Sequence, residues 1–166
     1  MTYIYIDPDT AHNLHDYIIQ TSWGREWIEI PWETEKVLEL MQYYYYPTFE
    51  DKLAYLMHKI ACNHWYKDWN KRTALELWRY FIDLNFETHL AVSFYAYFEN
   101  LMKLIVTRDI SEDFLKEIIH EFMNWNIDSN EHIKIWIYHA TVAFDKRKEQ
   151  RKKEEEQQLR NLWKKT

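Results

Sequence analysis

Apolar residues recur every three or four positions along most of the chain, which is the spacing of helices with one buried face. Local signals sharpen this prediction: Asp7 and Pro8 are typical of a helix start, and residues 48–51, TFED, form a capping box. Helices are expected to begin near residues 7, 34, 49, 70, 89, 111 and 130. The second is expected to run to about Tyr46, because Pro47 follows. The last is expected to direct these side chains to the core: Ile133, Trp136, Ile137, Ala140 and Phe144.

Two stretches depart from the helical spacing. Residues 2–6, TYIYI, have the composition of a β-strand but are too few for more than an edge strand. Residues 22–31, SWGREWIEIP, contain the only glycine and predict an extended flap or hairpin. Its alternating residues are Trp27, Ile28, Glu29 and Ile30. The pattern therefore predicts a compact all-α domain with a short N-terminal strand or flap hairpin.

Composition agrees with a helical domain. One glycine and three prolines among 166 residues leave few sharp turns, and 47% apolar residues are enough for a packed core. The single cysteine, Cys62, has no internal disulfide partner and is interpreted as a buried small residue. The sequence shows neither a long uncharged apolar run nor a signal-peptide pattern, so we expect a cytoplasmic protein without membrane contact.

Charge is unevenly distributed along the chain. Residues 145–166 carry 9 of the 21 Lys and Arg residues and 5 of the 27 Asp and Glu residues, a net charge of +4, which leaves −10 for residues 1–144. An acidic body does not fit a broad DNA-binding face, which needs cations spread over one surface, but it allows a small anion pocket. We therefore expect one domain over residues 1–144, no DNA partner, and a charged helical extension or tail over residues 145–166.

Candidate chemistry is concentrated in residues 64–75, HWYKDWNKRTAL, here called the motif segment. His64 can accept a proton from a hydroxyl near neutral pH, and Asp68 can hold Mg²⁺. The next helix start offers a phosphate site made of free N–H groups and three side chains, Asn70, Lys71 and Arg72. A base, a metal ligand and a phosphate site in this order suit phosphoryl or nucleotidyl transfer. The same residue types also serve as ordinary helix caps and solvated cations, so residue types alone leave both interpretations open.

The motif segment resembles the signature of the Fic/Doc proteins, which is His, any residue, Phe, any residue, an acidic residue, a small residue, Asn, then Gly-Arg or Lys-Arg. The matching residues are His64, Asp68, Asn70, Lys71 and Arg72, and TAL at residues 73–75 continues as in Doc toxins. The opening YIYIDPDTAHNLHDYII resembles the short strand and first helix of Doc-like chains. The resemblance covers about residues 3–125.

This resemblance implies that the residue matching His64 is a general base, that the one matching Asp68 binds Mg²⁺, and that the helix start holds the phosphates of ATP. At the position of Lys71 the chain resembles Doc, which also has Lys and transfers the terminal phosphate of ATP to a threonine of elongation factor Tu. Members with Gly at this position usually transfer AMP. The resemblance thus implies a toxin-like or phage-type effector, acting on a protein substrate in a bacterium or an infected host cell. A separate antitoxin is a possible partner, and the flap would position the target by strand pairing.

Two residues of the motif segment depart from the signature. Tyr66 stands where Phe is usual, and its ring can still fill the core if its hydroxyl finds a partner. Trp69 replaces a small residue in the anion loop, where its indole can cover the phosphate site, stack on a base or point to solvent. Besides the kinase and the AMP transferase, the sequence therefore leaves a catalytically silent Fic-like binding protein as an alternative.

Eight histidines raise the question of a metal site elsewhere in the chain. His12 and His15 lie one helical turn apart, but the pattern provides no third ligand. They are therefore interpreted as surface or partly buried histidines on a helix that buries Ala11, Leu14 and Ile18.

Overall fold

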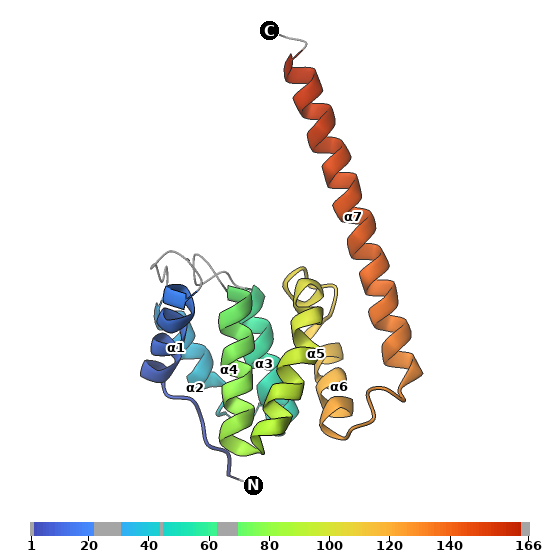
Figure 1. The fold of residues 1–166 in the computed structure, drawn as a ribbon. Coiled ribbons are helices and arrows are strands. Elements are labelled where there is room, and N and C mark those ends of the chain that lie inside the picture. Colours follow the sequence, from blue (N-terminus) through green and yellow to red (C-terminus); the bar gives the residue numbers. More distant parts are fainter. Residues whose placement is uncertain (1, 22–30, 44, 63–69, 164–166) are drawn as a thin grey trace. The chain divides into compact units, whose positions relative to one another are not determined.

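A computed structural model describes residues 2–21, 31–43, 45–62 and 70–163, and these ranges contain seven α-helices and no strand (Figure 1). The predicted all-α class is thus confirmed for the described part of the chain. The chain divides into two compact units, Met1–Ile127 and Asp128–Thr166.

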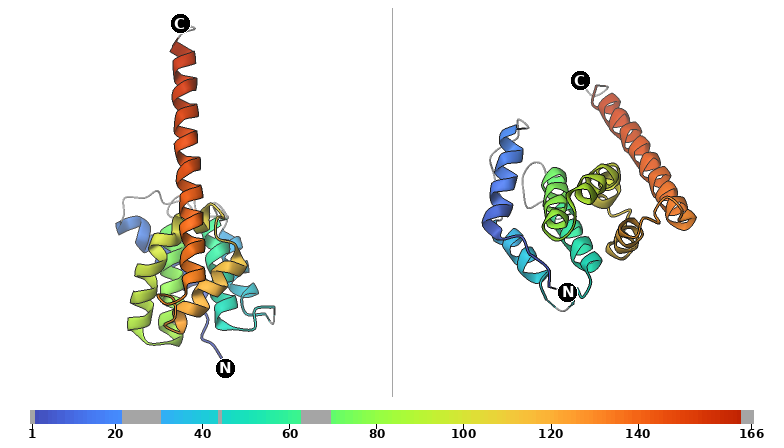
Figure 2. Two further views of the ribbon diagram at one scale, coloured as in Figure 1. Left: turned by 90° about the vertical axis from the view of Figure 1, so that its right-hand side faces the viewer. Right: turned by 60° about the horizontal axis from the view of Figure 1, so that its bottom comes forward.

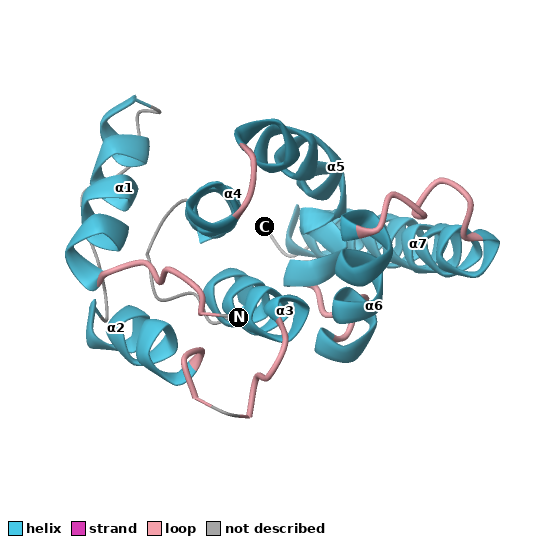
Figure 3. Cartoon of the chain, turned by 90° about the horizontal axis from the view of Figure 1, so that it is seen from below, coloured by secondary structure: helices cyan, strands magenta, loops and turns pink. Residues whose placement is uncertain are grey.

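Six helices make up the first unit: α1 (Pro8–Thr21), α2 (Pro31–Leu40), α3 (Phe49–Cys62), α4 (Asn70–Asn85), α5 (Thr88–Val106) and α6 (Glu112–Met123). α3 and α4 form its centre (Figures 2 and 3). α4 packs against α1, α3 and α5, and α3 also packs against α2, α5 and α6. α4 is thus covered on three sides, so packing within this unit fixes its position.

Aromatic side chains hold α4 in place. Trp78 is fully buried and meets Phe94 and Phe98 of α5 edge-on, with ring centroids 6.1 Å apart in each pair. Phe81, also fully buried, stacks on Phe49 of α3 at 4.8 Å. Large aromatic contacts of this kind dominate the burial of apolar surface that stabilises a core.

The N-terminal segment corrects one prediction. Residues 2–6 form no strand, so the expected edge strand is wrong. The Ile4 backbone N–H donates to Asn85 Oδ1 at 2.8 Å, and Asn85 Nδ2 donates to the Ile4 carbonyl at 2.9 Å. The amide side chain at the end of α4 thus takes the place that a neighbouring strand would fill. The predicted flap residues Trp27–Ile30 lie outside the described residues.

α2 differs from its predicted extent at both ends. It begins at Pro31, ahead of the predicted start, because proline fits the first turn of a helix. It ends at Leu40, so the prediction that it reaches Tyr46 is wrong. The buried Lys52 of α3 donates from Nζ to the Met41 carbonyl at 2.8 Å, and the Tyr46 ring packs on a tyrosine of α3 at 4.2 Å. Both contacts come from α3 and draw the chain away from the helical path.

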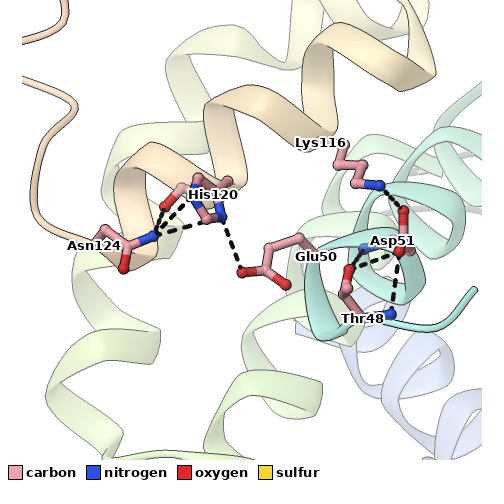
Figure 4. A network of polar contacts seen from close by, with 6 residues as sticks. All are labelled: Thr48, Glu50, Asp51, Lys116, His120 and Asn124. Atoms are coloured by element: carbon pink, nitrogen blue, oxygen red, sulfur yellow. Dashed lines mark hydrogen bonds and ion pairs between the residues drawn. The ribbon is translucent and has the colours of Figure 1, made fainter.

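A polar network joins the start of α3 to α6 (Figure 4). The Thr48 hydroxyl accepts from the Asp51 N–H at 3.1 Å, and the Asp51 carboxylate accepts from the Thr48 N–H at 3.1 Å, which confirms the capping box. Lys116 of α6 forms an ion pair with Asp51, and His120 lies 3.4 Å from Glu50. Burial alone would raise the pKa of Asp51, but hydrogen bonds from Lys116 and Thr48 outweigh it and hold that pKa below its usual range.

The second unit consists mainly of α7 (Glu131–Trp163), a helix of 33 residues. Asn130 caps it, accepting the Ile133 N–H at 3.2 Å, as the predicted start implies. Ile133 and Ala140 are buried, but Trp136 is 52% exposed, so its prediction as a core residue is wrong. Residues 145–163 are helical and exposed throughout.

Candidate functional site

The described part of the motif segment is the start of α4. The helix begins at Asn70, as predicted, so Asn70, Lys71 and Arg72 form its first turn. The Lys71 and Arg72 side chains are exposed. The side chain of Asn70 lies outside the described part of the chain. So do the remaining predicted residues of the motif segment, which are His64, Tyr66, Asp68 and Trp69.

The first turn of α4 has the electrostatics of an anion site. The first N–H groups of any α-helix have no acceptor within the helix, and the helix dipole places partial positive charge there. In α4 this turn carries two cationic side chains and no acidic residue. A phosphate oxygen is therefore a favourable ligand at this turn. Figure 1 shows the turn at the same end of the first unit as the last turns of α1 and α3.

A buried hydrogen bond ties this first turn to α1. His15 Nδ1 lies 2.9 Å from the Thr73 hydroxyl, and either group can donate, depending on the tautomer of the ring. His15 is 1% exposed and Thr73 is 0% exposed. The interpretation of His15 as a surface or partly buried histidine is therefore wrong, because its ring packs inside the α1–α4 interface.

The His15 ring is neutral at ordinary pH. Burial lowers its pKa from 6.5 to about 4, an effect that the nearby Asp16 opposes and His12 reinforces. The bond to Thr73 thus joins two uncharged groups and needs no counterion. Removing either partner would leave a buried polar group without this bond, which is costly in a water-free interface.

Beside the first turn of α4 lies a pocket of about 360 Å³ between α1, α4 and α5. Its lining residues are Leu14, Tyr17, Ile18 and Thr21 of α1, Arg72, Glu76 and Arg79 of α4, and Tyr95 and Glu99 of α5. Arg79 Nε donates to the Glu76 carboxylate at 2.8 Å. The pocket combines aromatic and apolar walls with both signs of charge.

Tyr95 is the pocket residue whose titration is shifted. Burial raises the pKa of its hydroxyl, and the carboxylates of Glu76 and Glu99 raise it further. Tyr95 therefore keeps its proton at physiological pH and can donate a hydrogen bond.

Sequence reasoning missed both His15 and the pocket. A signal for His15 was present, because Ala11, His15 and Ile18 follow the spacing of a buried helix face, and all three are buried. The pocket had no comparable signal, since its walls come from three helices that are far apart in the sequence.

Other candidate sites are less developed. Cys62 is buried, as predicted, and its thiol donates to the Ile105 carbonyl at 3.2 Å. Among the described residues, no three His, Cys, Asp or Glu side chains are grouped closely enough to hold a metal ion. None of the helices in the described ranges has the length and apolar character needed to cross a membrane.

Comparison with known proteins finds a partial match to a family model. The sequence model described as the Fic/DOC family matches residues 5–82, slightly less than half of the chain. The match includes the whole motif segment and runs from just before α1 almost to the end of α4. No curated protein and no solved structure matches the chain.

Proposed function

We propose that this chain is a Doc-like transferase that moves the terminal phosphate of ATP to a Ser or Thr hydroxyl of a protein target, as a toxin-like effector. The observation that carries the proposal is the exposed, cationic first turn of α4, which directly follows His64 and Asp68 in the sequence. The Fic/DOC match over residues 5–82 supports it, because members of that family typically transfer phosphorus-containing groups.

Each residue of the motif segment has a role in this proposal. His64 accepts the proton of the target hydroxyl as its oxygen attacks the γ-phosphorus, and ADP leaves with the electron pair of the broken bond. Lys71, Arg72 and the first N–H groups of α4 hold the phosphates in line for that attack. Asp68 would hold Mg²⁺, which offsets phosphate charge when it is bound.

Lys71 favours phosphate transfer over AMP transfer within this proposal. Gly occupies this position in the Fic proteins that transfer AMP, whereas the Doc branch has Lys. The two reactions would use the same acceptor hydroxyl but break different bonds of ATP, so the position of the transferred label separates them.

The test uses the full chain, Mg²⁺ and bacterial extract with ATP labelled at either the γ- or the α-phosphate. Protein labelling from γ-labelled ATP alone is the expected result. Labelling from α-labelled ATP would establish AMP transfer instead. In either case His64→Ala should abolish labelling, and labelling that persists in this variant would contradict the role of His64.

The anion site is tested separately by nucleotide binding. Arg72→Ala should weaken MgATP binding about tenfold or more, because a charge-assisted contact to phosphate is lost. Lys36→Ala is the matched control, since it removes an exposed cation from α2, away from the α4 start. Equal effects of the two substitutions would show that only overall charge matters.

The alternative is a catalytically silent binding protein, and it rests on Trp69, whose indole can cover the phosphate site. If the indole closes the phosphate site, MgATP will not raise the melting temperature of the wild type. A ligand at a hundred times its dissociation constant should stabilise the protein by about 2.7 kcal/mol. The absence of both a thermal shift and labelling would overturn the proposed transferase.

A further inference from the structure

The start of α4 is held by a contact between the motif segment and a residue outside it. Thr73 directly follows the exposed Lys71 and Arg72, and its hydroxyl lies 2.9 Å from Nδ1 of His15 on α1. Both partners are buried, so water does not compete for the bond. This is a buried polar contact between two neutral groups.

Such a contact fixes the rotation of the helix start about its own axis. Successive residues of an α-helix are about 100° apart around the axis, so the direction of Thr73 determines those of Lys71 and Arg72. Apolar packing alone tolerates small rotations, whereas a hydrogen bond requires a defined direction and distance. With Thr73 turned toward α1, the two cations point to the exposed side of the turn.

The other end of α4 has its own, separate contact. Asn85 exchanges two hydrogen bonds with the backbone of Ile4 and also donates to the Phe81 carbonyl at 2.8 Å. α4 is thus held at each end by residues from the N-terminal part of the chain. The contact at Asn85 is far from the cationic turn and offers a natural control.

We propose that His15 is a positioning residue for the anion site: through Thr73 it sets the orientation of the first turn of α4, and with it the direction of Lys71, Arg72 and the first backbone N–H groups of the helix. This inference rests on the proposed function, in which that turn holds the phosphates of ATP. The low pKa of His15 agrees with a neutral orienting partner.

The experiment combines four substitutions at the His15–Thr73 pair and one control substitution with two main readouts. His15→Phe and Thr73→Val keep the volume and remove the bond, whereas His15→Asn and Thr73→Ser retain a polar group in the required place. Asn85→Ala is the control at the far end of α4. The readouts are the affinity for MgATP and the hydrogen exchange of the amides of residues 74–76, which bond to the carbonyls of the first turn.

We expect the dissociation constant of MgATP to rise about tenfold in His15→Phe and Thr73→Val, because small misplacements of a binding group are costly. The amides of residues 74–76 should exchange faster in the same two variants. His15→Asn and Thr73→Ser should restore both values toward the wild type. Asn85→Ala should lower the melting temperature while leaving MgATP affinity and these amides unchanged.

Two results would overturn the inference. The first is unchanged MgATP affinity in His15→Phe and Thr73→Val although the wild type binds the nucleotide. The second is unchanged exchange at residues 74–76 in these variants. If the wild type itself fails to bind MgATP, the proposed function is wrong, and the exchange measurement still decides whether His15 orients the turn.

Discussion

α4 and α7 are both long helices, but different interactions stabilise them. α4 has 16 residues, and Leu77, Trp78, Phe81 and Ile82 are all fully buried in it. α7 has 33 residues, of which only Ile133 and Ala140 are buried among those described. Residues 145–163 are all exposed, and pairs one turn apart, such as Glu149–Lys153 at 2.8 Å, link successive turns there.

The difference bears on where a binding site can be built. A helix held by packing on three sides has a start whose position is fixed, which is what phosphate recognition requires. A helix stabilised by charged side-chain pairs one turn apart can be fully helical although packing against a core does not fix the position of its ends. The predicted anion site lies on the first kind of helix.

Trp78→Ala should have the largest effect in this comparison. It removes the centre of the aromatic contact with α5 and should lower the free energy of unfolding by about 3–5 kcal/mol. Trp136→Ala in α7 is the matched control and should change it by no more than about 0.5 kcal/mol, because that ring is half exposed. Urea unfolding followed by circular dichroism measures both. Similar losses of unfolding free energy in the two variants would contradict the proposed difference between α4 and α7.

A pH below 6.5 should have an intermediate effect on the free energy of unfolding, because it acts on the buried His15–Thr73 hydrogen bond between α1 and α4. The pKa of His15 is about 4 in the folded protein and ordinarily 6.5, so the unfolded chain binds the proton first. Stability is therefore fully present above about pH 6.5 and falls as the pH drops toward 4. The full shift corresponds to roughly 3 kcal/mol, which is the upper bound of the expected loss.

His15→Asn isolates this titration. It keeps a hydrogen-bonding group beside Thr73 but has no proton to gain, while every carboxylate and the other histidines remain. The difference in unfolding free energy between wild type and His15→Asn should therefore change between pH 6.5 and 4. Parallel pH profiles for the two proteins would show that His15 does not titrate as its burial implies.

The smallest effect is expected for Lys153→Ala in α7. Its partner Glu149 is exposed, the pair lies on a solvated face, and salt screens it. The melting temperature should remain within experimental error of the wild type, at low and at high ionic strength. A fall of several degrees would show that α7 depends on its surface pairs more than its exposure suggests.

Helix starts were the feature that the sequence determined best. The capping box at Thr48, the cap at Asn130 and the start of α4 at Asn70 were all predicted, because each depends on residues within one turn of one another. The same local order predicted that Lys71 and Arg72 would follow a helix start. The roles of His64 and Asp68 remain predictions.

Only the tertiary structure decided the features whose partners are distant in the sequence. His15 and Thr73 are 58 residues apart, and Ile4 and Asn85 are 81 apart. Lys52 ends α2 by reaching Met41 from the next helix. A sequence pattern records which side chains are able to bond, but the packing of helices selects the partner. For this reason the motif segment could be recognised from the sequence, whereas the pairing of His15 with Thr73 could not.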